Sequence, residues 1–291
     1  MSGGPQVPAR SLTVLETGPL TTVQDAGRSG QGALGIGRSG ACDRAAYRLA
    51  NRLVGNEQGA AVLEVTFGGL VVRAETDLLV AATGARCLGA PHNAPLQLAA
   101  GAQLALGAPV TGARTYVAVR GGIDVPRVLG SRSTSVLAEL GPDVLSAGDR
   151  LSVGHQFGPM PGVDVAAVPD PEAGDVLVQV MPGPRRDWFS DEAWASLLGQ
   201  RYAVTEQSNR VGIRLDGDPL ARARTGELPS EGMVRGALQI PTSGTPVLFL
   251  ADHPVTGGYP VIAYVVDTDV DRCSQLRAGQ GLRFTTHPQR G

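Results

Sequence analysis

Short apolar runs separated by glycine and proline constrain the fold of this chain more than any other feature. The sequence contains 40 glycines and 21 prolines. Between them stand runs rich in Val, Ile, Leu and Thr, such as 62–67, 78–82, 115–119 and 261–266. Runs this short fit strands, and turn residues at this spacing are typical of sheets that close on themselves. We therefore predict a mainly β protein built from β-barrel domains, with a few short helices.

The chain is expected to divide near its middle. Residues 157–174 are rich in proline and glycine and lack apolar periodicity, which is typical of a linker. Similar fragments occur in the same order on both sides of it, LEVTFGG and AGDRLSV before and LQIPTSG and AGQGLRF after, which suggests two copies of one β unit. We predict an N-terminal β-barrel domain over 11–156, a C-terminal β-barrel domain over 175–291 and a disordered tail over 1–10.

Three short helices are expected. The first begins at residue 39 or 40, carries alanines and leucines on one face and stops at Gly55. The second has Ser190 as its N-cap, with two acidic residues at the positive end of the helix dipole, and stops at Gly199. The third covers approximately residues 269–277.

Charge and cysteine content exclude several classes of protein. The formal net charge is −2 and like charges do not cluster, so neither a nucleic-acid partner nor a membrane surface is indicated. The apolar runs are too short for a signal peptide or a membrane span. The three cysteines are widely spaced and odd in number, which argues against disulfides and against a metal site. We expect a cytoplasmic protein without a metal centre.

The absence of lysine limits the chemistry of the chain. All 25 basic residues other than histidine are arginines. A biotinyl-lysine, a Schiff base and a phosphate-loop lysine are therefore impossible within this chain. If the protein works with ATP or with a carried biotin, the lysine that either requires must come from another chain.

The first candidate site is the glycine-rich stretch from Gly18 to Asn56. Gln24, Asp25 and Arg28 are predicted to project from one loop whose glycines allow a ligand or another segment to approach closely. Ser39 and Asp43 follow at the expected start of a helix, where free N–H groups attract anions. The alternative for these two residues is a purely structural helix cap.

The second candidate site is the stretch TYVAVRGGIDVPRVLGSRSTS. Arg120 follows a strand that is expected to be buried, and Asp124 and Arg132 follow glycines. Because the guanidinium group suits two-point recognition of a carboxylate or phosphate, Arg120 or Arg132 is a candidate anchor for an acidic substrate. The alternative is a structural ion pair between Arg120 and Asp124.

The third candidate site is LADHPVTGGYPVIAYV. Asp252 and His253 end a strand, and a glycine pair presents Tyr259, so these three residues are candidates for proton transfer. A turn-capping aspartate beside a surface histidine is the alternative. We predict that this turn, the loop around Asp25 and the turn from Arg120 to Asp124 converge on one cleft.

With these motifs the sequence resembles the carboxyltransferase-like family that includes the C subunit of 5-oxoprolinase and the second allophanate-hydrolase-type subunit. The resemblance runs from about Leu12 to Phe284 and rests on ordered motifs that include GPLTTVQDAGRSG, SGACDRAAYRLANRLVGN, VLEVTFGG, SEGMVRGALQIPTSGTPVLFLAD and TGGYPVIAYV. It implies cyclophilin-like β-barrels. It also implies two partner proteins: one is a B subunit homologous to a sensor-kinase inhibitor, and the other is an A subunit.

The resemblance also implies a reaction, the ATP-dependent opening of 5-oxo-L-proline to L-glutamate by the whole complex. On this interpretation the chain is inactive alone, and a lysine of another protein in the complex handles the nucleotide. Two alternatives remain open. One is a carboxyltransferase component that acts on urea or another amide with biotin, and the other is a non-enzymatic regulator that binds a sensor-kinase-inhibitor homologue.

Overall fold

The computed structural model describes residues 10–155 and 158–288 of the chain. Three α-helices of 10, 9 and 7 residues lie within that part. The prediction of a mainly β fold with a few short helices is confirmed. No helix among the described residues combines the length and the apolar character that crossing a membrane requires.

Two compact units make up the protein, and each is assembled from separate stretches of sequence. The first comprises Met1–Gly27, Arg44–Thr134 and Leu140–Asp170, and the second comprises Arg28–Asp43, Ser135–Glu139 and Pro171–Gly291. Relative to the predicted ranges 11–156 and 175–291, two short segments, 28–43 and 135–139, belong to the second unit, and the predicted linker is divided between the units after Asp170. The contacts that hold these segments in the second unit are described with the candidate site.

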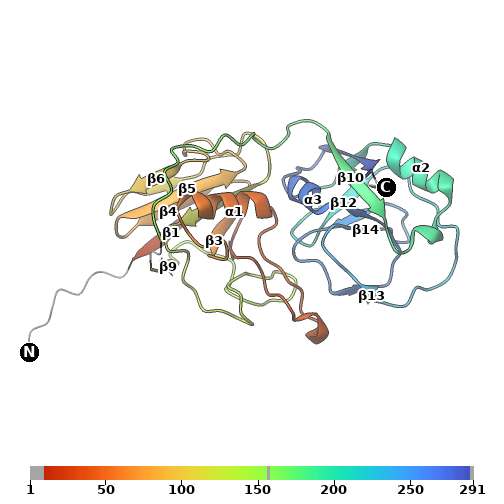
Figure 1. The fold of residues 1–291 in the computed structure, drawn as a ribbon, viewed down its shortest axis with the longest axis horizontal. Coiled ribbons are helices and arrows are strands. Elements are labelled where there is room, and N and C mark those ends of the chain that lie inside the picture. Colours follow the sequence, from red (N-terminus) through yellow and green to blue (C-terminus); the bar gives the residue numbers. More distant parts are fainter. Residues whose placement is uncertain (1–9, 156–157, 289–291) are drawn as a thin grey trace, which may run out of the picture. The chain divides into compact units, whose positions relative to one another are not determined.

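The first unit consists of two antiparallel sheets and one helix (Figure 1). The strand orders are β7-β4-β1-β9 and β2-β3-β8-β5-β6. The elements are β1 (Ser11–Thr17), β2 (Leu20–Gln24), α1 (Arg44–Leu53), β3 (Val62–Thr66), β4 (Leu70–Ala74), β5 (Leu78–Gly84), β6 (Pro95–Leu98), β7 (Gln103–Ala105), β8 (Arg114–Val119) and β9 (Arg150–Ser152). Alternate residues of both sheets, among them Val14, Val72, Leu63 and Val117, share one buried apolar core, as expected for sheets packed face to face.

Helix α1 begins later than the sequence predicts. It starts at Arg44 rather than at residue 39 or 40, because Ser39 has a φ of 56°, a left-handed conformation that a right-handed helix cannot include. The helix ends as predicted near Gly55, which also has a positive φ. The Thr83 hydroxyl of β5 donates to the Ala46 carbonyl at 2.7 Å and ties the helix to its sheet.

The second unit is built around a closed barrel with the strand order β10-β17-β14-β15-β12-β11-β18. Its elements are η1 (Gly32–Leu34), β10 (Val176–Pro182), η2 (Arg186–Trp188), α2 (Asp191–Gly199), β11 (Tyr202–Val204), β12 (Gly212–Asp216), β13 (Glu231–Gly232), β14 (Ala237–Gln239), β15 (Val247–Phe249), β16 (Thr256–Gly257), β17 (Val261–Val265), α3 (Asp267–Cys273) and β18 (Gly281–Thr286). The pair β10–β18 is parallel. Val178, Leu238, Ile262 and Phe284 fill the interior of the barrel with apolar side chains.

The two remaining helices lie close to their predicted positions. Helix α2 has the predicted bounds, and the Ser190 hydroxyl accepts a hydrogen bond from the Ala193 amide at 3.2 Å, which confirms the N-cap. Helix α3 covers Asp267–Cys273, so it begins and ends earlier than the predicted 269–277. The three cysteines are free and buried.

The predicted tail and linker fall partly outside the described residues. Residues 1–9 and 156–157 are not described. Arg10 belongs to the first unit, where its guanidinium donates to the carbonyls of Gly154 and Arg120 at 2.6 and 2.7 Å. The linker residue Ala166 donates its amide to the Asn93 carbonyl at 2.7 Å. The described part of the linker up to residue 170 is therefore held on the first unit.

Candidate functional site

A polar cavity of about 480 Å³ lies in the first unit. Loops that follow β2, α1, β8 and β9 form its walls. Its charged or titratable lining residues are Asp25, Glu57, Asp124, Arg127, Arg132 and His155. Six glycines also line it. Two of the three segments that the sequence singled out, the loop around Asp25 and the turn before Asp124, therefore meet at one hollow.

Asp25 is a buried carboxylate that is hydrogen-bonded by neutral donors. Its oxygens accept from the hydroxyls of Ser131 and Ser133 at 2.6 Å each, from the Arg132 amide at 2.6 Å and from the Gly27 amide at 2.8 Å. Burial alone would raise the pKa of Asp25, but these four hydrogen bonds outweigh it and hold the pKa below the ordinary value. Asp25 thus stays ionised and fixes the loop 131–133 beside the cavity.

Asp124 and Arg132 form an ion pair in the wall of the cavity. The Arg132 guanidinium also donates through Nε to the Val125 carbonyl at 2.7 Å. The side chain of Arg132 is 23% exposed and that of Asp124 is 53% exposed, so the pair is open to solvent and to a ligand. Arg132 therefore remains a candidate anchor for an acidic group.

Arg120 has a different environment. Its two terminal nitrogens donate to the Val54 carbonyl at 2.8 Å and to the Gly158 carbonyl at 2.6 Å. A buried guanidinium at this place caps the end of α1, where carbonyls lack helical partners. Asp124 is paired with Arg132 instead, so the structural alternative of an Arg120–Asp124 ion pair is not the arrangement found.

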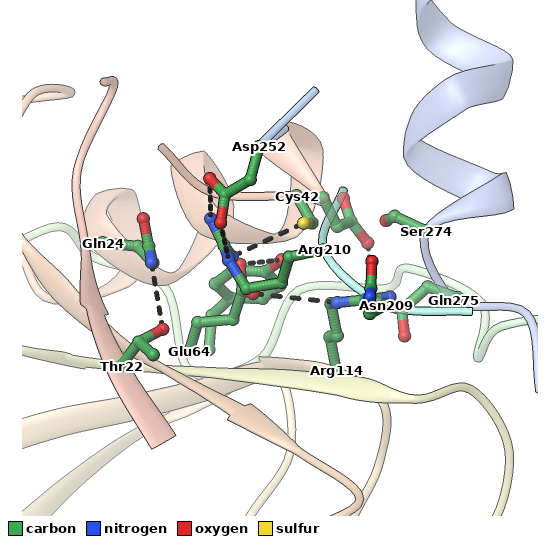
Figure 2. A network of polar contacts seen from close by, with 12 residues as sticks. Thr22, Gln24, Cys42, Glu64, Arg114, Asn209, Arg210, Asp252, Ser274 and Gln275 are labelled. Carbon is green, nitrogen blue, oxygen red and sulfur yellow. Dashed lines mark hydrogen bonds and ion pairs between the residues drawn. The ribbon is translucent and has the colours of Figure 1, made fainter. Parts of the chain in front are cut away.

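Gln24 lies fully buried at the end of β2. Its amide nitrogen donates to the Thr134 carbonyl at 2.9 Å. It also donates to the Thr22 hydroxyl at 3.0 Å, as Figure 2 shows. Its amide oxygen is buried and has no hydrogen-bond partner among the described residues. Gln24 therefore braces the segment that carries Asp25 and keeps one acceptor available.

A second polar cluster on the first unit's five-stranded sheet was missed in the sequence. The Glu64 carboxylate on β3 is 1% exposed and accepts from the Tyr116 hydroxyl of β8 at 2.8 Å. The Arg114 Nε lies 3.7 Å from the other Glu64 oxygen, and Figure 2 shows both side chains. Glu64 falls within the motif VLEVTFGG. Side chains of a strand point alternately to its two faces, so Glu64 lies on the face opposite to its apolar neighbours, and this pattern could have indicated a buried charge there.

Asp252 forms a buried ion pair in the second unit. Its carboxylate accepts from Arg210 Nε at 3.0 Å and Nη2 at 3.2 Å, as Figure 2 shows. The Ser39 hydroxyl donates to the same carboxylate at 2.6 Å, and the Val136 amide lies 3.3 Å away. Both charged side chains are at most 3% exposed. Ser39 therefore serves Asp252 and not the start of α1.

Further contacts hold residues 28–43 in the second unit. Arg210 donates to the Gly40 carbonyl at 2.8 Å and to Cys42 Sγ at 3.4 Å. Gln275 donates to the Asp43 carboxylate at 2.8 Å. The buried Arg28 closes the base of the loop through its amide, which donates to the Arg38 carbonyl at 2.8 Å. These contacts explain why this early stretch of sequence belongs to the second unit.

His253 and Tyr259 lie on the turns that follow Asp252. The His253 Nδ1 is 2.8 Å from the Pro254 carbonyl, so this nitrogen carries a proton and donates it. Tyr259 is 43% exposed, and the Arg222 guanidinium lies 5.6 Å from the centre of its ring. The predicted convergence of all three segments on one cleft stays a prediction, because Asp252, His253 and Tyr259 belong to the second unit.

Several residues of these sites were not singled out in the sequence. Glu57, Arg127 and His155 line the cavity, and Arg210 holds Asp252. Arg127 falls inside the second candidate stretch, TYVAVRGGIDVPRVLGSRSTS, which indicated the right region but not this side chain. Among the described residues, no three His, Cys, Asp or Glu side chains are grouped so as to hold a metal ion.

Comparison with known proteins gives the family. Residues 34–286 match the model of the carboxyltransferase domain, subdomains A and B. The chain belongs to this carboxyltransferase family. It is 38% identical to the C subunit of 5-oxoprolinase from Escherichia coli, over 94% of this chain and 90% of that protein. It is 33% identical to urea amidolyase of Lachancea kluyveri, over 94% of this chain and 17% of that protein.

Solved structures of this family have the same fold. The crystal structure of TTHA0988 superposes with a TM-score of 0.86 at 34% identity, over 97% of this chain and 57% of that one. The urea amidolyase of Kluyveromyces lactis superposes with a TM-score of 0.88 at 29% identity, over 97% of this chain and 19% of that one. The chain thus corresponds to 57% and 19% of the length of these two larger chains.

Proposed function

We propose that this chain is a component of an ATP-dependent 5-oxoprolinase complex that opens 5-oxo-L-proline to L-glutamate. The observation that carries the proposal is the 38% identity to the C subunit of 5-oxoprolinase from Escherichia coli over 94% of this chain. The same proposal includes two partner proteins. One is a B subunit that resembles a sensor-kinase inhibitor, and the other is an A subunit. The proposal also includes a cytoplasmic location, where the three free thiols remain reduced.

ATP and biotin are assigned to the partners in this proposal. The cavity of the first unit presents the carboxylates of Asp25, Glu57 and Asp124 against the guanidinium groups of Arg127 and Arg132. Such a lining does not suit a triphosphate, since the carboxylates repel its charges. Without lysine the chain also offers no attachment point for biotin. On this proposal neither group binds to this chain.

Opening a cyclic amide requires an anchor for the substrate carboxylate, an activated water and a proton donor for the departing nitrogen. Arg132 is the better anchor of the two arginines named from the sequence, because the terminal nitrogens of Arg120 already bind two backbone carbonyls. Asp252, paired with Arg210, suits a fixed negative charge that orients its neighbours. Separately, within the second unit, His253 and Tyr259 are proposed as proton-transfer groups of the complex, with His253 acting through Nε2.

Reconstitution tests the proposal. The chain is combined with the purified A and B subunits from the same organism, and ATP-dependent release of glutamate from 5-oxoproline is measured. We expect turnover only when all three proteins are present. Arg132→Gln should abolish most of it at an unchanged thermal midpoint, whereas Arg283→Gln, a half-exposed arginine of the second unit, should keep it. Equal turnover without this chain contradicts the proposal.

Carboxyl transfer to urea or another amide is the second candidate function. The identity of 33% to the urea amidolyase of Lachancea kluyveri and the TM-score of 0.88 to that of Kluyveromyces lactis favour it. The same reconstitution distinguishes the two candidates when carboxylated biotin carrier and urea replace 5-oxoproline and ATP. Consumption of carboxybiotin that depends on urea, without release of glutamate, would select this second function.

A further inference from the structure

The cavity of the first unit has the size and polarity of a site for a small metabolite. Its volume of about 480 Å³ falls within the roughly 300 to 1,000 Å³ typical of ligand pockets. Chain packing requires some of its glycines, since a Cβ on Gly121 would lie 2.2 Å from the Gly154 carbonyl oxygen. Packing does not require Gly59, whose added Cβ would meet no atom within 4 Å. This glycine leaves room in the hollow.

The charged groups of the lining fall into two sets. Asp25 is saturated by four hydrogen bonds, and Asp124 is paired with Arg132. Arg127 has only one weak contact among the described residues, to the Gly130 carbonyl at 3.5 Å. Glu57 has no side-chain partner within the same part of the chain. The cavity therefore presents one guanidinium and one carboxylate whose charges the protein does not neutralise.

The charges of the lining residues define the charge of a suitable ligand. The lining holds three carboxylates and two guanidinium groups, so one negative charge is in excess when histidine is counted as neutral. An anion without an ammonium group would add repulsion and leave Glu57 without a counter-charge, and a simple cation would leave Arg127 without one. A molecule with one carboxylate and one ammonium group satisfies both Arg127 and Glu57.

We propose that this cavity binds a zwitterionic α-amino acid, its carboxylate on Arg127 beside Arg132 and its ammonium group on Glu57. This inference adds a ligand site to the proposed function. It rests on that function in one respect, namely that L-glutamate is the product of the reaction. The cyclic amide 5-oxoproline carries the carboxylate but no ammonium group, so it leaves Glu57 without a charged partner. The cavity should therefore prefer the opened amino acid to the lactam and serve as a product or effector site.

Isothermal titration of the full chain, with neither its partners nor ATP present, tests this inference. The probes are L-glutamate and L-glutamine, with glutarate, which lacks the ammonium group, and 5-oxoproline as matched comparisons. We expect saturable binding of at least one amino acid, and binding at least about tenfold weaker for glutarate and 5-oxoproline, as the loss of one charged contact implies.

Variants connect the binding to the cavity. Glu57→Gln and Arg127→Gln should each weaken amino-acid binding about tenfold, and Arg283→Gln should leave it unchanged. Both cavity side chains are exposed, so the thermal midpoint should not move; Glu57→Asp serves as a second variant if it does. Absence of saturable binding of either amino acid, equal binding of glutarate, or unchanged binding by both cavity variants overturns the inference. Because no turnover is measured, these outcomes are independent of whether the reconstituted complex releases glutamate.

Discussion

Asp25 of the first unit and Asp252 of the second are buried aspartates that the sequence had marked as functional, and the two units stabilise them by different means. In the first unit, Asp25 accepts four hydrogen bonds from hydroxyl and amide groups and forms no ion pair with another described residue. In the second, Asp252 faces the Arg210 guanidinium, and the Ser39 hydroxyl adds a third donor. The first carboxylate is held by four hydrogen bonds from neutral donors and the second mainly by one charged partner.

This difference determines how much stability each unit loses when one partner of its buried aspartate is substituted. A carboxylate with several neutral donors loses one contact at a time, and the remaining donors still solvate it. A buried ion pair has one charged partner, and removal of that partner leaves a charge in the interior that the remaining neutral donors compensate only in part. The second unit should therefore respond to one substitution far more strongly than the first.

The largest effect is expected for Arg210→Met. Because Asp252 is fully buried, loss of the guanidinium should lower the free energy of unfolding by about 3 to 5 kcal/mol. Urea denaturation followed by circular dichroism measures this. A loss below about 1 kcal/mol would show that Asp252 is solvated by other groups and would remove the contrast between the units.

A smaller loss is expected for Asp25→Asn in the first unit. The amide nitrogen of asparagine would face the Arg132 or Gly27 amide, both of which are donors. One buried donor then lacks an acceptor, which costs about 1 to 3 kcal/mol. Urea denaturation compares this variant with Asp124→Asn, which changes an exposed carboxylate of the same cavity. Equal losses for the two variants would contradict a special role of the buried group.

Acid should expose the dependence of the first unit on the charge of Asp25. Hydrogen bonds depress the pKa of Asp25 in the folded protein, so its contribution to stability is complete above the ordinary aspartate pKa of about 3.9 and is lost as the pH falls through the folded pKa. Urea midpoints between about pH 6 and pH 3 should therefore fall more steeply for the natural protein than for Asp25→Asn. Parallel curves would show that Asp25 is not the titrating group.

The smallest effect is expected for Arg201→Gln. Arg201 pairs with Asp175 at 2.8 Å, but both side chains are 39% exposed. Exposed pairs contribute about 0 to 1 kcal/mol, so the urea midpoint should barely change. This variant is the matched control for Arg210→Met because both remove an arginine–aspartate pair from the second unit. If Arg201→Gln lowers the free energy of unfolding nearly as much as Arg210→Met does, burial is not the reason why the two ion pairs differ in strength.

Local signals in the sequence were more reliable than signals that depend on distant residues. The N-cap of α2 at Ser190 is correct because the cap and its partner Ala193 lie within one turn. The start of α1 was predicted wrongly because Ser39 resembles an N-cap, while its real partner Asp252 is 213 residues away. The motifs located the loops that form the cavity, but they did not identify Glu57 and Arg127, since solvent exposure and pairing depend on the folded arrangement.

The discontinuous make-up of the second unit has a consequence for how the protein is made. Residues 28–43 leave the ribosome early, whereas Asp252 and Gln275, which bind Ser39 and Asp43, follow 213 and 232 residues later. During synthesis, domains usually fold one after another from the N-terminus. The second unit cannot fold in this way, because its first segment is made long before the rest of the unit. Its first segment must wait, without its final partners, until Asp252 and Gln275 have been translated.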